Sequence, residues 1–173
     1  DLTNYSVMKL NSEKLMEKAL KKSDTITVVA RAAPIYDAEH PDNLHSHVFD
    51  HKENVGYVFG EGDYGFTFCC VFNLIDFING IVSVPQGKYS GVYNVCDSRQ
   101  LNANEIIQYE KDRHRIGAVI RKSLGSEKAM LFNKGKMRTD YRYFDPTITF
   151  NNWSFDNTRA KRIAPMRWNL SNR

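Results

Sequence analysis

Hydrophobic and polar positions alternate along the chain with two different periods, which predict both helices and strands. In residues 3–22 the apolar positions recur at the spacing of one helical face, and Lys and Glu occupy the other. That face carries Met8, Ser12, Leu15, Met16 and Ala19. Residues 25–30 (TITVVA) follow as a β-branched run with little alternation, which is typical of a strand covered on both faces. A helix leading into a buried strand is one step of a parallel α/β sheet.

The middle of the chain predicts shorter elements. Residues 55–59 and 66–71 are expected to be two strands joined by the turn GEGDYG at residues 60–65. Residues 91–95 (GVYNV) form another predicted strand. Between them Asn73 is expected to cap a short helix with an apolar face. That face consists of Leu74, Phe77, Ile78 and Ile81.

The clearest local signal is a helix start at Asn102. Glu105 follows Asn102 at the spacing of a capping box, and Leu101 and Ile106 can form the hydrophobic staple around it. The helix is expected to run on toward a stop signal at Gly125, with no defined end before it. Residues 129–132 are a candidate strand, and residues 155–157 are expected to begin a final short helix that ends by Pro165.

Composition and charge narrow the class of protein. With 173 residues, 42% of them hydrophobic, the chain can form one compact domain with a core. It contains no apolar run near the roughly 18 residues that a membrane span needs, and no signal segment, so we expect a soluble cytoplasmic protein with no membrane partner. The three cysteines, Cys69, Cys70 and Cys96, show no disulfide or zinc spacing and are expected to be reduced and buried.

Two other kinds of site are not favoured. The formal charge of +4 is mild and the basic residues are spread out, so we expect no nucleic-acid partner. Four histidines lie within twelve positions, but a polar loop explains them better than a metal site, and we predict no metal: His40, His45, His47 and His51. The GxGxxG pattern of residues 60–65 precedes a predicted strand rather than a helix, so it predicts a hairpin turn and no dinucleotide site.

Tyr5 and Lys9 are the first candidates for catalysis. Their i,i+4 spacing places both side chains on one face of the predicted helix, a turn apart. A nearby ammonium favours the phenolate form of a tyrosine, and such a tyrosine can exchange a proton with a substrate hydroxyl. Two exposed helix residues would show the same spacing, so the pair gains weight only from the motifs that follow it.

Those motifs occur in a characteristic order. After the Tyr5/Lys9 pair come RAAPIY at 31–36, DNL at 42–44, YVFGEG at 57–62, GVYNV at 91–95, NEII at 104–107 and DNTRAKR at 156–162. In order and spacing the series resembles the second half of the extended short-chain dehydrogenase/reductases, the NAD-dependent epimerase/dehydratase family. The resemblance extends over nearly the whole chain, from Asn4 to Arg162.

The resemblance implies roles for particular residues. Tyr5 matches the catalytic acid/base of the family, and Lys9 matches the lysine that holds the nicotinamide ribose; both are thus catalytic and cofactor-binding candidates. Ala33, Pro34 and Ile35 match the segment that passes the nicotinamide carboxamide. The positions that match the wall of the substrate pocket are Asn43, Leu44, Phe59 and Phe66.

The chain also departs from the family pattern. Phe66 stands where the family usually has an arginine that grips the substrate diphosphate, and alternation would place Phe68 on the same face. An apolar wall there suits a less charged substrate, unless Arg121, Arg138 or Arg142 reaches into the pocket. Pro34 also replaces a common asparagine, and the usual ending of the last motif is absent.

The expected fold is α/β: the C-terminal part of a Rossmann-like parallel sheet (residues 1–36) with a small mixed α/β substrate-binding region (residues 37–173). The complete enzyme would be an NAD- or NADP-dependent epimerase or dehydratase, homodimeric and acting on a small molecule such as a nucleotide sugar. The phosphate-binding glycine motif is not in this chain, so the chain alone is expected to be inactive and to bind NAD weakly. The alternatives are a reductase of another substrate, a non-catalytic binding domain on the same scaffold, or a basic nucleic-acid-binding module.

Overall fold

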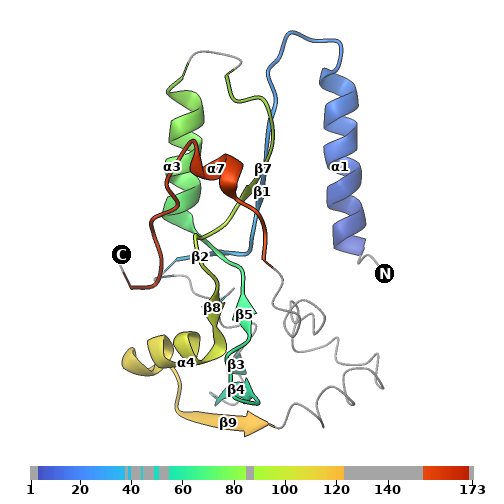
Figure 1. The fold of residues 1–173 in the computed structure, drawn as a ribbon. Helices are drawn as coiled ribbons and strands as arrows, with labels where there is room; N and C mark the ends of the chain where they lie inside the picture. The colour runs from blue at the N-terminus through green and yellow to red at the C-terminus, as the bar shows by residue number, and fades with distance from the viewer. Residues whose placement is uncertain are drawn as a thin grey trace.

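The computed structural model describes residues 4–37, 39, 44, 49–50, 55–84, 88–122 and 154–171 (Figure 1). Its helices are α1 (Asn4–Leu20), α3 (Val71–Val82), α4 (Ala103–Asp112) and α7 (Thr158–Lys161). Its strands are β1 (Val28–Ala32), β2 (Ile35–Tyr36), β3 (Phe49–Asp50), β4 (Val55–Phe59), β5 (Gly65–Phe66), β6 (Cys69–Cys70), β7 (Gly91–Val95), β8 (Leu101–Asn102) and β9 (Ala118–Lys122). The predicted strand at 129–132, Asn43 and the four loop histidines lie outside the described residues.

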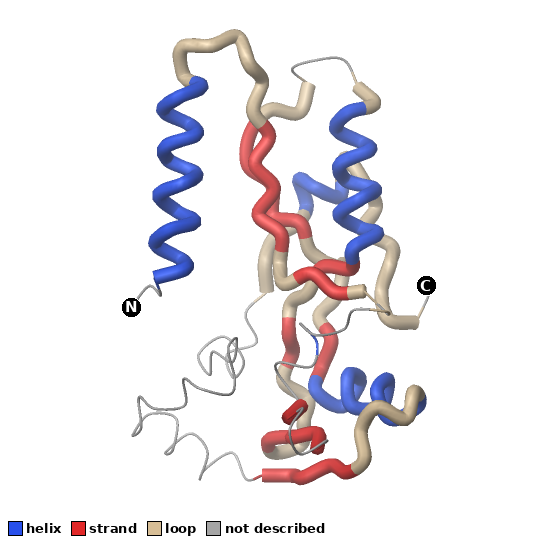
Figure 2. Tube along the Cα trace, turned by 180° about the vertical axis from the view of Figure 1, so that it is seen from behind, coloured by secondary structure: helices blue, strands red, loops and turns tan. Residues whose placement is uncertain are grey.

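Strands β1 and β7 form a parallel pair at the centre of one end of the molecule. Their register runs from Val28 opposite Gly91 to Ala32 opposite Val95. Helix α1 runs beside this pair on one side, and α3 and α7 lie on the other (Figures 1 and 2). Strands β1 and β7 are far apart in sequence. The predicted parallel α/β unit therefore forms only when these two strands pair in the folded chain.

One expectation for this unit is wrong. The sequence of residues 25–30 predicts a strand covered on both faces, but β1 begins at Val28 and its last three residues are exposed. Among the described residues β7 is the only strand that pairs with β1. The apolar run indicated a strand whose two faces are buried by other elements. Within the described residues, the elements packed on β1 do not bury both of its faces.

The other end of the molecule is built on β4. It pairs with β3 in antiparallel fashion and with β9 in parallel fashion, and α4 packs on the resulting sheet. Gly56 makes this packing possible, because a Cβ atom there would lie 2.4 Å from Cδ1 of Ile107 and 3.3 Å from Cδ1 of Ile116. The absence of a side chain at Gly56 thus allows α4 to pack close to the sheet.

The predicted hairpin between residues 55–59 and 66–71 is wrong. The second run divides into β5, which pairs with β8, and β6, which pairs with β2. Strand β4 pairs with neither of them, although Gly60 and Gly62 do adopt the positive φ angles of a turn. As expected, a strand and not a helix follows the GxGxxG pattern. The division arises because Thr67 and Phe68 carry the chain from one small sheet to the next.

The two middle helices differ in how well the sequence predicted them. The capping box of α4 is present, with Asn102 Oδ1 accepting from Glu105 N and Asn102 N donating to Glu105 Oε2. That helix ends at Asp112, however, and β9 occupies part of the segment before Gly125. Helix α3 forms, but its N-cap is Cys70 rather than Asn73, and Ile78 is 48% exposed instead of buried.

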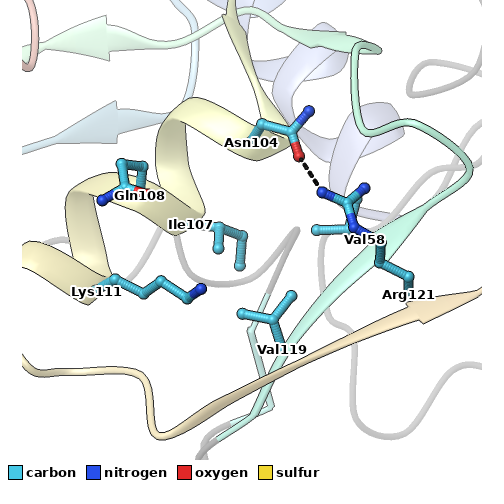
Figure 3. Close-up of a pocket in the computed structure, with 7 residues that line it drawn as sticks. All are labelled: Val58, Asn104, Ile107, Gln108, Lys111, Val119 and Arg121. Carbon is cyan, nitrogen blue, oxygen red and sulfur yellow. Dashed lines mark hydrogen bonds between the residues drawn. The ribbon is translucent and has the colours of Figure 1, made fainter.

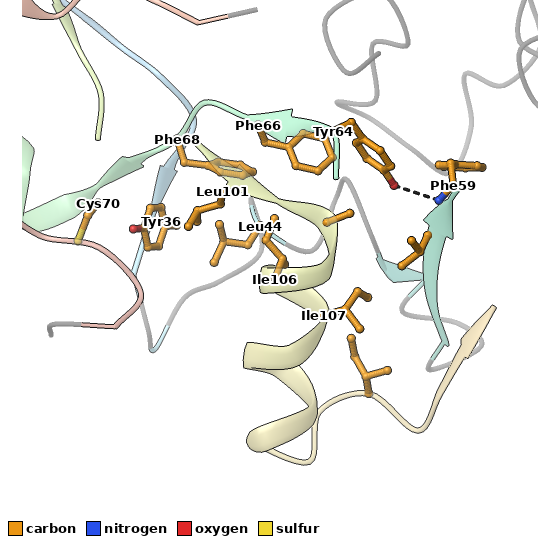
Figure 4. Packing of buried hydrophobic residues seen from close by; sticks show 13 residues of the cluster. Tyr36, Leu44, Phe59, Tyr64, Phe66, Phe68, Cys70, Leu101, Ile106 and Ile107 are labelled. Atoms are coloured by element: carbon orange, nitrogen blue, oxygen red, sulfur yellow. Dashed lines mark hydrogen bonds between the residues drawn. The ribbon is translucent and has the colours of Figure 1, made fainter. Parts of the chain in front are cut away.

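Aromatic and aliphatic residues from β5, β8 and α4 form the larger core (Figure 4). The rings of Tyr64, Phe66 and Phe68 follow one another with centroid distances of 5.4 and 5.9 Å, and Tyr36 meets Phe68 edge-on at 6.0 Å. A second cluster packs α3 and α7 against β7 through Phe77, Tyr93 and other residues. The three cysteines are buried and form no disulfide with one another, as expected. None of the described helices is long and apolar enough to cross a membrane.

Candidate functional site

A cavity of about 400 Å³ opens at the carboxyl ends of the parallel strands β1 and β7. It is lined by Arg31, Ala32, Ala33, Asn94, Val95, Cys96 and Phe155. Open α/β sheets bind their ligands in this position, outside the carboxyl ends of parallel strands. The alanines leave the strand ends free of bulky side chains, so a flat ligand could approach the backbone here.

The backbone around this cavity is held in place by long-range hydrogen bonds. Ala33 N donates to Val95 O, which continues the β1–β7 pairing one residue further, and Cys69 N donates to Pro34 O. Ile35 then enters β2 and pairs with Cys69. Of the three residues expected near a nicotinamide, Ala33 lines the cavity, and Pro34 and Ile35 follow it directly.

Helix α1 presents Tyr5, Lys9 and Glu13 along one stripe, each four residues from the next. Lys9 Nζ lies 5.5 Å from the centroid of the Tyr5 ring, so the two side chains are stacked as the spacing predicts. Tyr5 is 63% exposed. The stripe thus places a phenol and an ammonium together near the start of α1.

The same stripe is attached to the cavity wall. Glu13 Oε2 accepts from Arg31 Nε at 3.0 Å, and Glu13 Oε1 accepts from Arg31 Nη2 at 2.5 Å. This bidentate pair holds the pKa of Glu13 below its usual value and raises that of Arg31. Because Glu13 pairs with Arg31 of β1, the face of α1 that carries Tyr5 and Lys9 is turned toward β1. Arg31 also lines the cavity.

The expected substrate residues lie elsewhere. Leu44, Phe59 and Phe66 are all buried members of the larger core, packed around Tyr64 and α4. None of them lines the cavity at the strand ends, and Asn43 is outside the described residues. Of the expected site residues, the structure places Ala33 at the cavity and stacks Lys9 on Tyr5 on α1, and it buries Leu44, Phe59 and Phe66 in the larger core.

Sequence reasoning missed Asp97, which follows β7 and organises the floor of this region. Its carboxylate accepts hydrogen bonds from Tyr36 Oη at 2.8 Å, Cys70 N at 2.7 Å and Asn73 Nδ2 at 2.7 Å. Burial raises the pKa of Asp97, although the hydrogen bonds oppose that shift, and burial beside this carboxylate raises the pKa of Tyr36. The available signal was an acidic residue two positions after the predicted strand at 91–95.

Asn73 and Asn157 connect this carboxylate to the end of the chain. Asn73 accepts from Trp168 N and donates to Trp168 O, and Asn157 donates to the carbonyls of Cys96 and Asp97. These bonds place the segment with Phe155 against the cavity. Burial also raises the pKa of the Cys96 thiol, which favours the neutral form of that cysteine at the cavity wall. Among the described residues no cluster of three or more metal-ligating side chains occurs.

Solved structures with a similar fold are NAD-dependent sugar-nucleotide enzymes. UDP-glucuronic acid 4-epimerase from Bacillus cereus, in complex with UDP-glucuronic acid and NAD, matches with a TM-score of 0.62 and 19% identity, over 99% of this chain and 50% of that one. UDP-glucose 4-epimerase from Thermotoga maritima, with UDP-glucose, matches with a TM-score of 0.55 and 15% identity, over 93% of this chain and 47% of that one.

A dehydratase belongs to the same group of similar structures. The NAD-dependent NDP-hexosamine 5,6-dehydratase of tunicamycin biosynthesis matches with a TM-score of 0.50 and 17% identity, over 91% of this chain and 56% of that one. No protein-family model and no curated protein sequence matches this chain. The chain spans about half the length of the solved structures it matches. It therefore shares, over that half, the Rossmann-like α/β fold of NAD-dependent nucleotide-sugar epimerases and dehydratases, as its motifs predict.

Proposed function

We propose that these 173 residues are the substrate-binding half of an NAD(P)-dependent enzyme that epimerises or dehydrates a nucleotide sugar. One observation carries the proposal: the Tyr5–Lys9–Glu13 stripe is joined through Arg31 to a cavity at the carboxyl ends of two parallel strands. Such chemistry needs a phenol that can reach a substrate bound at the strand ends. The fold shared with NAD-dependent epimerases and dehydratases supports it.

Tyr5 would exchange a proton with the substrate hydroxyl at its Oη atom. Lys9 would keep a positive charge beside the phenol during that exchange. Glu13 and Arg31 would position the helix, because their bidentate pair joins α1 to the strand that ends at the cavity. Neither Glu13 nor Arg31 is required to touch the reacting atoms.

The cavity residues suit a flat aromatic amide. Ala32 and Ala33 present only methyl groups, Phe155 offers a ring and Asn94 an amide, so a nicotinamide ring could lie against the strand ends. Ala33, Pro34 and Ile35 would pass its carboxamide, and Lys9 would hold the adjoining ribose. When bound, such a cofactor supplies a hydride acceptor. Among the described residues no glycine turn leads into a helix, so we assign none of them to its pyrophosphate.

The position of Phe66 bears on the substrate. Phe66 packs in the core between Tyr64 and Phe68, and on this ground we give it no weight against a charged substrate. This removes the main reason to prefer an uncharged substrate. A nucleotide sugar is therefore the proposed substrate class.

The test is a turnover screen of the intact protein with NAD and NADP against UDP-, GDP- and dTDP-sugars, with uncharged hydroxy-ketones alongside. We expect the protein to epimerise or dehydrate at least one nucleotide sugar, detected by NMR of the product. Binding of a nucleotide sugar without turnover would favour the non-catalytic scaffold. Turnover of hydroxy-ketones alone would favour a reductase of another substrate class.

A further inference from the structure

A second cavity, of about 450 Å³, lies at the other end of the molecule between α4 and the β4–β9 sheet (Figure 3). Its apolar floor consists of Val58, Ile107 and Val119, and its polar rim of Asn104, Gln108, Lys111 and Arg121. It shares no lining residue with the cavity at the ends of β1 and β7. The proposed sugar-nucleotide chemistry therefore makes no use of it.

The helical period of α4 and the alternation of β9 place these side chains around one cavity. Asn104, Ile107, Gln108 and Lys111 occupy one face of α4, at spacings of three and four residues. Val119 and Arg121 are two apart in β9 and so share a face of the sheet, where Arg121 pairs in register with Val58. In Figure 3, Ile107 and Val119 point into the cavity from opposite sides, and the Lys111 ammonium lies beside them.

Arg121 is fixed in place by neutral acceptors. Its Nη1 lies 3.4 Å from both Gly60 O and Glu61 O, and its Nη2 lies 3.3 Å from Asn104 Oδ1. Asn104 in turn donates to Glu61 O at 2.7 Å. Contacts at 3.3–3.4 Å are long for hydrogen bonds, so they orient the guanidinium but leave most of its capacity for a stronger, charged acceptor.

The turn of residues 60–62 is shaped to allow this arrangement. Gly62 has a φ of +76°, and a Cβ atom there would lie 2.6 Å from Asn104 Oδ1 and 2.5 Å from Val58 Cγ1. A glycine at this point lets Asn104 approach both the turn and Arg121. The fold therefore positions the Arg121 guanidinium without a ligand.

The charge of the cavity is positive. None of the seven lining residues is acidic, and no ion pair among the described residues includes Lys111 or Arg121. Asp112, which follows Lys111 in α4, accepts a hydrogen bond from Gln108 Nε2 at 2.7 Å. Two cations at the rim of an apolar floor suit a ligand that has a doubly charged anionic group and an apolar body.

We propose that this cavity binds a small organic phosphate, with the phosphate between Lys111 and Arg121 and the apolar part on Val58, Ile107 and Val119. A phosphate monoester carries nearly two negative charges at neutral pH and offers several strong acceptors. The Arg121 fork and the Lys111 ammonium supply charge-assisted donors. The proposal is independent of the sugar-nucleotide function.

The probe is phenyl phosphate, which combines a flat apolar ring with a dianion. Titration calorimetry on the full 173-residue chain would compare it with inorganic phosphate, which lacks the ring, and with phenol, which lacks the charge. We expect phenyl phosphate to bind more tightly than either. In ¹⁵N NMR spectra the shifted backbone amides should be those of residues 104–111 and 118–121. Equal affinity for phenyl phosphate and inorganic phosphate, or shifts at the β1–β7 cavity instead, would overturn the proposal.

The decisive variants are Lys111→Gln and its matched control Lys18→Gln. Both lysines are exposed and in the last turn of a helix, so both chains should fold, but only Lys111 lines the cavity. Loss of one charge-assisted contact should weaken phenyl phosphate binding about tenfold or more in the Lys111 variant. The control should bind like the parent chain. Unchanged affinity in the Lys111 variant would show that this cavity is not the site.

Discussion

Helix α1 and the core around α4 differ sharply in how much apolar surface they bury. Around α4, β5 and β8, the aromatic and aliphatic side chains pack into one closed core, and Leu101 and Ile106 are fully buried. On α1 the corresponding side chains are open, with Leu15 67% exposed and Met16 56% exposed. Both segments show an apolar helical face in the sequence, but within the described residues only one of these faces has a partner.

This difference separates stability from the proposed chemistry. The core around α4 fixes the chain, whereas Tyr5 and Lys9 lie on the helix that contributes little to that core. An ion pair between Glu13 and Arg31 is among the contacts that join α1 to the strands. Functional side chains on a loosely packed element can change without loss of the fold, so activity and stability should respond to different substitutions.

The largest effect is expected from Tyr5→Phe in the intact protein. The substitution keeps the ring over which Lys9 lies and removes only the hydroxyl. Turnover should fall about a hundred- to ten-thousandfold, the usual contribution of general acid–base transfer. The unfolding midpoint should not change, because the ring is largely exposed. A turnover within a factor of about two of the parent would make Tyr5 an ordinary helix residue and favour a non-catalytic scaffold.

The next largest effect concerns the packing itself. Leu101→Ala should lower the free energy of unfolding by about 2–5 kcal/mol, because Leu101 is 1% exposed and its removal leaves a cavity in the larger core. Leu15→Ala on α1 should change it by no more than about 0.5 kcal/mol. Urea unfolding of the 173-residue chain measures both. A large decrease in the free energy of unfolding for Leu15→Ala would show that Leu15 is buried in solution, and the contrast between α1 and the core around α4 would disappear.

The same contrast explains what the sequence could predict. The capping box at Asn102 and Glu105 was predictable because its hydrogen bonds join residues three apart, and the Tyr5/Lys9 stack follows from helical spacing alone. The strand at 91–95 was recognisable from its β-branched pattern. Each of these features depends on neighbours along the chain, and each was confirmed.

The errors came from pairings between distant segments. Strand β9 forms where the helix was expected to continue, because Val119 and Ile120 gain hydrogen-bonded partners in β4 more than sixty residues earlier. Asn73 looked like a helix cap, but its side chain is needed by Asp97 and Trp168. No local pattern contains the information that decides these cases.

A smaller effect, with a defined sign, is expected from Asp97→Asn. Burial raises the pKa of Asp97 above its value in the unfolded chain, so the folded state binds this proton more tightly. The corresponding stability is present below the unfolded pKa and is lost as pH rises through the folded pKa, by about 1.4 kcal/mol for each unit of difference. Asparagine does not titrate but can still accept from Cys70 N and Asn73 Nδ2.

The unfolding free energy of the parent chain minus that of Asp97→Asn should therefore decrease as pH rises from about 4 toward neutrality. Asp156→Asn is the control with the opposite sign, because hydrogen bonds from Thr158 hold the pKa of Asp156 below its usual value and its contribution is lost as pH falls. Denaturant titrations at several pH values measure both. A difference that does not change with pH would mean that Asp97 is ionised equally easily in the folded and unfolded chains.

The smallest effect is expected from Glu13→Gln, which leaves an acceptor for Arg31 but removes the negative charge. Arg31 is exposed and Glu13 is partly exposed, so solvent screens their attraction, and the substitution should barely change the free energy of unfolding. Any difference from the parent should vanish in about 1 M salt, where the Debye length is about 3 Å. Glu17→Gln, one turn later on α1, removes the same charge without touching Arg31 and serves as the matched control. If the ion pair positions α1, only Glu13→Gln should raise the KM of the intact protein for its cofactor, and equal changes in both variants would point instead to the net charge of the helix.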